Sequence, residues 1–166
     1  FRSAKAFFDA QAAHIEPILE KEKTGLSVAF FAVASDGTIT VRKPNDYVSS
    51  MIELAGGTYS LNGYVPEEEN ALSTLKMQME DFYAAEKDAD ILIYNGTIEG
   101  ELTSIDELVQ KNSLFADFKA VKTGQVYTTG SNFYQQTSGT CDFIEDLNKV
   151  LNGETDAEYR FLKKIN

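Results

Sequence analysis

Leu26-Ser27-Val28-Ala29-Phe30-Phe31-Ala32-Val33 is a nearly continuous run of apolar residues, and it decides the fold. A strand that is buried on both faces needs such a run, which is typical of a parallel sheet covered by helices on each side. The next segment, Ser35-Asp36-Gly37, predicts a tight turn, and residues 38–42 are predicted to pair back as a second strand. We therefore expect a layered α/β protein built around residues 26–33.

Helical and strand patterns alternate along the rest of the chain. Asn45 or Asp46 can cap a helix over residues 47–54, and Ser104 with Glu107 forms a capping box that predicts a helix over 105–110. The other predicted helices cover residues 4–23, 78–87, 138–151 and 159–162, the other predicted strands cover 91–94 and 125–128, and a polar loop covers 62–72. This alternation predicts a three-layer α/β/α fold with a mainly parallel central sheet, preceded by a long helix.

The chain is acidic and of the size of one domain. Its 166 residues include 26 Asp and Glu against 15 Lys and Arg, which gives a formal net charge of −11. Nucleic acids and anionic membrane surfaces bind basic faces, so we expect neither as a partner. The single Cys141 excludes an internal disulfide, and no apolar run of the sequence approaches the roughly 18–20 residues of a membrane span.

The usual signatures of an enzyme are missing from the sequence. It contains no Gly-x-Ser-x-Gly elbow, phosphate-binding loop or dinucleotide fingerprint. His14 is the one histidine, and a single histidine in an Ala-rich helix is more often structural than catalytic. One His and one Cys cannot form a zinc site without several carboxylates, so we predict no metal site and no cofactor. Acidic pairs such as Asp88 with Asp90 are interpreted as solvated surface, although carboxylate pairs can do acid–base chemistry.

The loops that follow the predicted strands carry aromatic and polar side chains suited to binding. In open α/β sheets, ligands lie in the crevice beyond the carboxyl ends of the strands. Aromatic rings, amides and a guanidinium in this position can stack on and orient a large, flat or chelate-like ligand. The alternative is that these side chains simply cover the ends of the loops. The candidate ligand-binding residues are Arg42, Tyr47, Tyr94, Asn95, Thr97, Phe133, Tyr134 and Gln135.

Three phrases of the sequence occur in an order that resembles a known family. They are MIELAGG over residues 51–57, MEDFYAAEKDADILIY over 79–94 and LFADFKAVKTGQVYT over 114–128. Together they resemble the bacterial solute-binding proteins that serve iron-complex and cobalamin importers. In that family two α/β lobes are bridged by one long helix, and the ligand sits between them. The resemblance implies that residues 1–24 are an interlobe-type helix, that residues 25–166 are the C-terminal lobe, and that the N-terminal lobe is absent from this chain.

The resemblance also implies a function in transport. A protein of this family is the substrate-binding component of an ABC importer, and it would deliver a ferric siderophore, haem or a corrinoid to the membrane permease. It would work outside the cytoplasm, in the periplasm or as a cell-surface lipoprotein, with a signal that this chain does not show. Glu80 falls where the family's C-terminal lobe carries an exposed Glu that pairs with Arg residues of the permease. An acid in the first turn of a helix is also stabilised by the helix dipole, so a local role stays open.

Two other functions remain open. The sequence also predicts that the lobe can self-associate and that certain residues pack an edge strand. The chain could be a stand-alone α/β module that senses a small molecule or a protein, or a metal-dependent enzyme with Asp and Glu ligands. Apolar surface that the absent lobe would cover is expected to let the isolated lobe self-associate. The residues expected to pack an edge strand and the turn before it are Phe115, Phe118, Val121, Val126 and Tyr127.

Overall fold

The sheet is organised around β1 (Ser27–Val33), in the position that the sequence predicts. The computed structural model describes residues 2–66, 71–131, 133, 139–154 and 157–166. Within these ranges seven strands form one sheet in the order β4-β2-β1-β5-β6-β7, and β3 also pairs with β1. The other strands are β2 (Ile39–Arg42), β3 (Thr58–Tyr59), β4 (Thr74–Met77), β5 (Ile91–Tyr94), β6 (Val126–Thr129) and β7 (Leu162–Lys164).

The centre of the sheet is parallel, and antiparallel strands extend it on both sides. β1 pairs in parallel with β3 and β5, and β5 pairs in parallel with β6. β2 is antiparallel to β1, β4 is antiparallel to β2, and β7 is antiparallel to β6. β1 is buried from Val28 to Val33, and β5 is buried along its whole length. This burial explains the continuous apolar runs of both strands, because helices cover them from each side.

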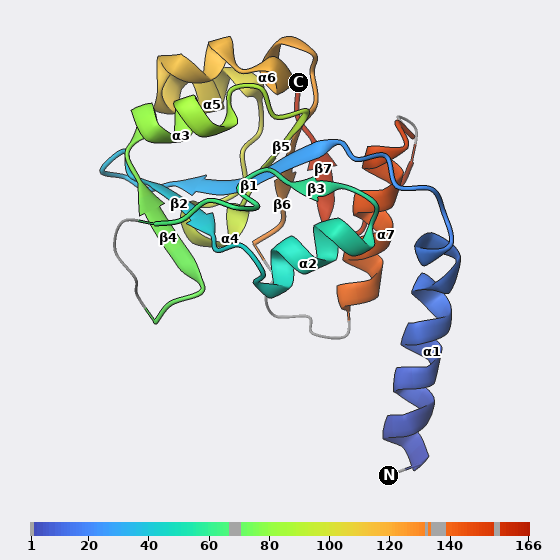
Figure 1. Ribbon diagram of the computed structural model, residues 1–166. Helices are drawn as coiled ribbons and strands as arrows, with labels where there is room; N and C mark the ends of the chain where they lie inside the picture. The colour runs from blue at the N-terminus through green and yellow to red at the C-terminus, as the bar shows by residue number, and fades with distance from the viewer. Residues whose placement is uncertain (1, 67–70, 132, 134–138, 155–156) are drawn as a thin grey trace.

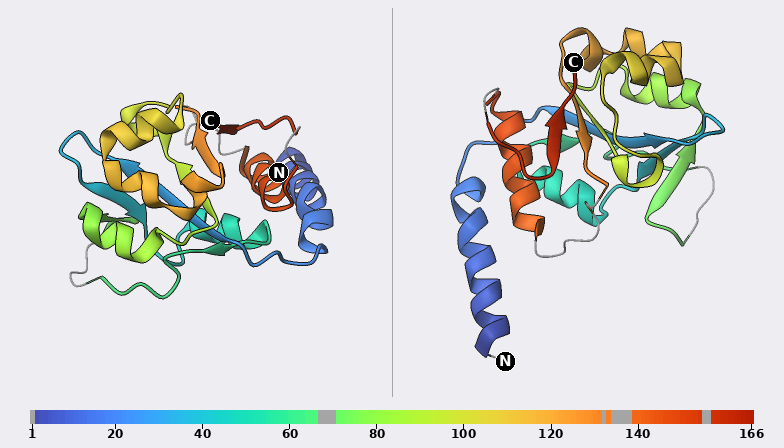
Figure 2. Two further views of the ribbon diagram at one scale, coloured as in Figure 1. Left: turned by 90° about the horizontal axis from the view of Figure 1, so that it is seen from above. Right: turned by 180° about the vertical axis from the view of Figure 1, so that it is seen from behind.

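Helices lie on both faces of the sheet (Figures 1 and 2). On one face are α3, α5 and α6, and on the other are α2 and α7. The helices are α1 (Arg2–Leu19), α2 (Tyr47–Leu54), α3 (Met79–Glu86), α4 (Gly96–Glu99), α5 (Ile105–Lys111), a 3-10 helix (Ser113–Asp117), α6 (Lys119–Lys122) and α7 (Thr140–Leu151). The predicted layered α/β fold is therefore confirmed.

Two consecutive phenylalanines of β1 supply the cores of the two faces, because successive side chains of a strand point in opposite directions. The ring of Phe31 lies 4.9 Å from that of Phe82 on α3 and 5.5 Å from that of Phe115, between centroids. The ring of Phe30 lies 6.1 Å from that of Phe133, which in turn lies 4.5 Å from that of Phe143 on α7. One strand thus joins both halves of the hydrophobic core.

α1 stands apart from these layers, with its N-terminal half extending away from the rest of the molecule (Figures 1 and 2). Its C-terminal half packs along α7, where the thiol of Cys141 bonds the carbonyl oxygen of Gln11 at 3.5 Å. The helix continues through Pro17 and ends at Leu19, four residues before the predicted end. None of the helices in the described ranges combines the length and the apolar character that a membrane crossing requires.

The C-terminal segment differs from the prediction. Residues 159–162 were predicted as a short helix, which is wrong, because residues 159–161 are irregular and β7, which begins at Leu162, pairs with β6. The buried carboxylate of Asp146 on α7 accepts hydrogen bonds from the backbone N–H groups of Arg160, Phe161 and Leu162, at 2.9, 2.7 and 3.2 Å. Four residues are too few to form a stable helix unaided, whereas the carboxylate binds these three N–H groups directly.

The same strand corrects a second expectation about packing. The segment LFADFKAVKTGQVYT was expected to pack an edge strand, but β6 lies between β5 and β7, and β7 is the edge strand on this side of the described sheet. Phe115, Phe118, Val126 and Tyr127 are buried as expected, whereas Val121 is partly buried. The aromatic residues of this segment therefore belong to the core and not to its border.

Removing the carboxylate of Asp146 should destabilise the protein strongly. Asp146→Ala leaves three backbone N–H groups without their acceptor, and unsatisfied buried donors cost on the order of 1–3 kcal/mol each. We expect the free energy of unfolding, measured by urea denaturation, to fall by about 3 kcal/mol. Asp88→Ala, at an exposed position, should change it by less than about 0.5 kcal/mol. Equal stability of the two variants would contradict this role for Asp146.

Candidate functional site

Arg42 and Tyr47 form one part of the candidate site, in which the tyrosine ring is exposed and the arginine is buried. Arg42 ends β2 and is 8% exposed, and its Nε donates to Oδ2 of Asp46 at 2.6 Å. Asp46 also caps α2, because its Oδ1 accepts from the N–H groups of Val48 and Ser49 at 2.9 and 3.0 Å. The guanidinium carbon lies 4.9 Å from the centroid of the Tyr47 ring, which is 51% exposed. The helix cap thus orients a cation behind an exposed aromatic ring.

Asn95 and Thr97 form a second polar group, at the end of β5. The Asn95 side chain is largely buried and caps α4, since its Oδ1 accepts from the N–H of Thr97 at 3.2 Å and from the Thr97 hydroxyl at 2.6 Å. Gly96 between them approaches β6 closely, and its N–H donates to the Thr129 hydroxyl at 3.0 Å. A Cβ on Gly96 would lie 2.3 Å from the carbonyl oxygen of Thr129, so only glycine allows this approach.

Tyr94 and Phe133 are core residues in this structure. Tyr94 is fully buried, its ring contacts that of Phe31 edge-on at 5.7 Å, and burial raises the pKa of its hydroxyl. Phe133 is 7% exposed and packs between Phe30 and Phe143. Neither ring has a face to offer a ligand in this state. The candidate residues 134 and 135 lie outside the described part of the chain.

The structure places the polar candidates in two pairs on either side of β1. Val41 of β2 and Tyr94 of β5 both pair with Phe31, from opposite sides. β2 is antiparallel to β1 and β5 is parallel to it, so the chain leaves the two strands in opposite directions. Arg42 with Tyr47 and Asn95 with Thr97 are therefore not neighbouring ends of parallel strands, as the sequence analysis assumed.

A buried acid, Glu86, lies behind the Arg42 pair and was missed by the sequence analysis. Its carboxylate is fully buried and has no hydrogen bond within the described residues, because the nearby Ser60 hydroxyl donates to the carbonyl of Val28 instead. Burial raises the pKa of Glu86 to about 7. Glu86 follows Met79 by seven residues on α3, so helical spacing alone could have placed it on the buried face.

Tyr59 connects the neighbourhood of Glu86 to the end of β2. Its hydroxyl donates to the backbone carbonyl of Arg42 at 2.6 Å. Burial raises the pKa of Tyr59, and the nearby charges of Glu86 and Asp46 raise it further. The hydroxyl therefore stays protonated and fixes the backbone from which the Arg42 side chain extends.

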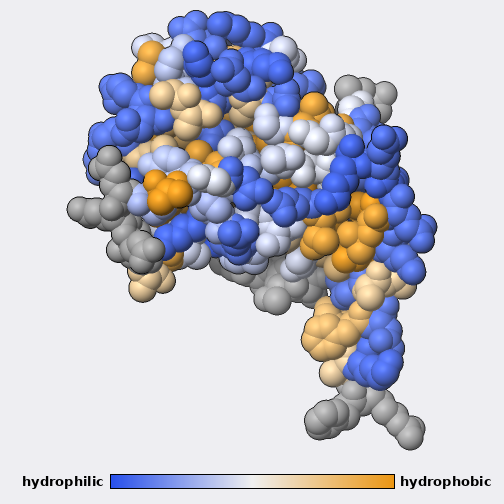
Figure 3. Space-filling view, viewed as in Figure 1, coloured by the Kyte–Doolittle hydropathy of each residue, from blue (hydrophilic) through white to orange (hydrophobic). Residues whose placement is uncertain are grey.

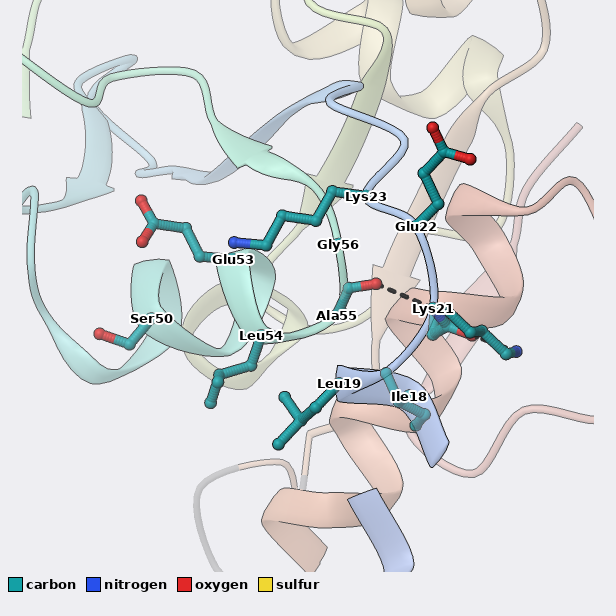
Figure 4. Close-up of a pocket in the computed structure, with 11 residues that line it drawn as sticks. Ile18, Leu19, Lys21, Glu22, Lys23, Ser50, Glu53, Leu54, Ala55 and Gly56 are labelled. Carbon is teal, nitrogen blue, oxygen red and sulfur yellow. Dashed lines mark hydrogen bonds between the residues drawn. The ribbon is translucent and has the colours of Figure 1, made fainter. Parts of the chain in front are cut away.

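A hollow of about 310 Å³ lies between the end of α1 and the C-terminal half of α2 (Figure 4). Leu19 and Leu54 project into this region and are 50% and 42% exposed, and Lys23 and Glu53 flank it. The side-chain amide of Asn148 donates to the carbonyl of Ala55 at 2.9 Å and joins α7 to the end of α2. The hollow can receive an apolar group flanked by charges, and the sequence analysis did not predict it.

Glu80 lies at the N-terminus of α3, on the opposite face of the sheet from α2. It is exposed, and with Asp81 it supplies two acids to the first turn. The helix has no side-chain cap, since Gln78 makes no capping hydrogen bond. The geometry therefore fits both stabilisation of the helix dipole and contact with a partner.

Comparison with known proteins establishes the family. A family model described as periplasmic binding protein matches residues 1–133, which is more than half of the chain. The chain therefore belongs to the periplasmic binding protein family. Membership implies an extracytoplasmic location, and the members of this family are binding proteins. A search of curated proteins finds no match.

Solved structures of similar fold include an ABC transporter substrate-binding protein from Listeria monocytogenes EGD-e, with a TM-score of 0.65 and 18% identity over 92% of this chain and 58% of that one. The siderophore periplasmic binding protein from the fuscachelin gene cluster of Thermobifida fusca gives 0.64 and 18%, over 91% and 54%. The periplasmic heme binding protein HutB of Vibrio cholerae gives 0.65 and 13%, over 93% and 57%. This chain thus spans about half the length of these proteins, and identities this low show the fold alone.

Glu86 should make the stability of the protein depend on pH. The folded chain keeps a proton on Glu86 up to about pH 7, whereas an ordinary glutamate loses it near 4.5. The stability that Glu86 contributes is therefore complete below pH 4.5 and is lost as the pH rises through 7. Glu86→Gln stays neutral, so at pH 8.5 it should unfold with a free energy about 3 kcal/mol higher than the unmodified chain, in urea titrations.

The difference should shrink towards zero near pH 4.5, where both side chains are neutral in the folded state. Glu20→Gln, at an exposed position, serves as the control and should show no such pH-dependent difference. A constant difference across the pH range would contradict the proposed titration of Glu86.

Proposed function

We propose that the chain is the C-terminal lobe of a solute-binding protein that captures a metal chelate for an ABC importer. The match of the family model over residues 1–133 carries this proposal. Similar structures include proteins whose names refer to siderophore and heme binding, which favours an iron complex as the ligand class. A corrinoid is kept as the alternative because of the sequence resemblance to iron-complex and cobalamin importers. The separate course of α1 supports its assignment as the interlobe-type helix, with residues 25–166 as the lobe.

The proposed mechanism is capture between two lobes followed by delivery to the permease. On this lobe, the exposed ring of Tyr47 would stack on the flat or chelated part of the ligand, and Arg42, which Asp46 holds behind it, would keep the ring in place. Thr97 and residues 134 and 135 remain candidates for further contacts. Tyr94 and Phe133 would support the site from the core and not touch the ligand.

Self-association of the lobe by itself is also proposed. Phe7 and Phe8 on α1 are 44% and 68% exposed, and Leu19 and Leu54 lie near the hollow between α1 and α2. Figure 3 shows apolar residues gathered on this side of the molecule. Exposed apolar surface of this kind favours association with another surface.

Ligand capture can be tested with the protein that carries both lobes. Haem, a ferric hydroxamate siderophore and a corrinoid would be titrated separately, and a ligand that binds the folded state should raise the melting temperature by mass action. Tyr47→Ala should weaken ligand binding by about fivefold, because an aromatic contact contributes on the order of 1 kcal/mol. Tyr64→Ala, beside β4 and α3, is the control and should leave the affinity unchanged. If none of the three classes binds, the proposed ligand class is wrong.

Docking by Glu80 can be tested separately from ligand binding. Glu80→Gln removes one charge from the first turn of α3, and we expect uptake in cells to fall at least fivefold while the ligand affinity of the purified protein is unchanged. Asp81→Asn removes the same charge from the same turn and should leave uptake near normal. Equal uptake by both variants would show that Glu80 has no specific role in docking.

A further inference from the structure

We propose that His14, Asp142 and Glu145 form a binding site for a divalent transition-metal ion, which would join α1 to α7. One ligand atom from each of the three residues lies within 4.8 Å of the others. Nε2 of His14 lies 2.6 Å from Oε2 of Glu145, and Nδ1 lies 3.8 Å from Oδ1 of Asp142. This site uses none of the residues of the proposed solute site on α2 and β2.

The two helices bring these residues together by a simple pattern. Asp142 and Glu145 are three residues apart on α7 and therefore share one face of the helix. His14 faces them from α1, and the position of α1 along α7 is fixed by a second contact, from the Cys141 thiol to the Gln11 carbonyl at 3.5 Å. The ligand set is thus assembled by helix packing before any ion binds.

Neighbouring cations orient the two carboxylates. Arg160 contacts Oδ2 of Asp142 at 2.7 Å, and Lys149 contacts Oε1 of Glu145 at 2.8 Å. In each carboxylate, one oxygen contacts a side-chain cation and the other faces the imidazole of His14. Oδ1 of Asp142 faces Nδ1, and Oε2 of Glu145 faces Nε2. Groups that hold the non-ligating atoms of a carboxylate or imidazole in this way are typical of metal sites.

The donor set selects the class of ion. One imidazole nitrogen and two carboxylate oxygens suit Zn²⁺, Co²⁺ or Ni²⁺, whereas Ca²⁺ and Mg²⁺ prefer oxygen ligands alone. With metal–ligand distances of about 2.0–2.1 Å, the ligand atoms of a tetrahedral site lie roughly 3.3 Å apart. For an ion on Nε2 of His14, the His14–Glu145 pair would open by less than 1 Å. Asp142, whose Oδ1 faces Nδ1 at 3.8 Å, would turn towards the same ion, and water would take the fourth position. The side chains are 22–37% exposed, so an ion can reach them from solvent.

Calorimetric titration of the tag-free protein with Zn²⁺ at pH 7.5 tests the site. We expect saturable binding of one ion per chain, and Mg²⁺ at the same concentration should not compete. His14→Ala and Glu145→Gln should each lower the affinity at least tenfold. Asp9→Asn, which removes an exposed carboxylate that pairs with Lys5 elsewhere on α1, should leave the affinity unchanged.

A spectroscopic measurement separates ligation from structural effects of the substitutions. Co²⁺ should give the visible absorption bands of a four-coordinate site with the unmodified protein and with Asp9→Asn, and these bands should be lost in His14→Ala. Circular dichroism of the metal-free variants checks that α1 and α7 are still folded. The proposal is overturned if Zn²⁺ binding is not saturable, or if the folded His14→Ala and Glu145→Gln variants bind as tightly as the unmodified protein.

Discussion

Burial of β1 on both faces is the constraint on which the rest of the structure depends. The strand pairs with three others and places Phe30 and Phe31 in opposite halves of the core. A polar residue at either phenylalanine would stand in a region without water, where an unpaired polar group costs several kcal/mol. Helices can cover both faces of the sheet because the side chains of β1 are apolar on both faces.

The elements that sequence predicts well are those with local causes. β1 and β5 are recognisable because strands buried on both faces must be apolar throughout, and α2 begins where Asp46 caps it. β7 could not be predicted, since it depends on the carboxylate of Asp146 about fifteen residues earlier. β3 and β4 are short, and the alternation of buried Leu75 and Met77 with exposed Lys76 is too brief to separate from the following helix.

In the candidate site, too, the sequence predicts local features but not those that depend on distant residues. Sequence identifies Arg42, Tyr47 and Asn95 as residues after strands, but it does not give the direction of each strand. The antiparallel course of β2 separates Arg42 from the end of β5, and burial removes Tyr94 from any contact with a ligand. The approach of His14 to Glu145 was equally inaccessible, because these residues are far apart in sequence and meet only through the packing of α1 on α7.

Asn148 connects the two regions for which we propose binding. Its side-chain oxygen accepts from Lys21, just after α1, at 2.8 Å, and its amide donates to Ala55 at the end of α2. Asn148 lies one turn of α7 beyond Glu145 and is 4% exposed. α2 begins with the Asp46 cap that orients Arg42 and ends next to Ala55, so this helix lies between the Asn148 contacts and the solute site. A movement of α1 would have to break these hydrogen bonds or carry α7 and α2 with it.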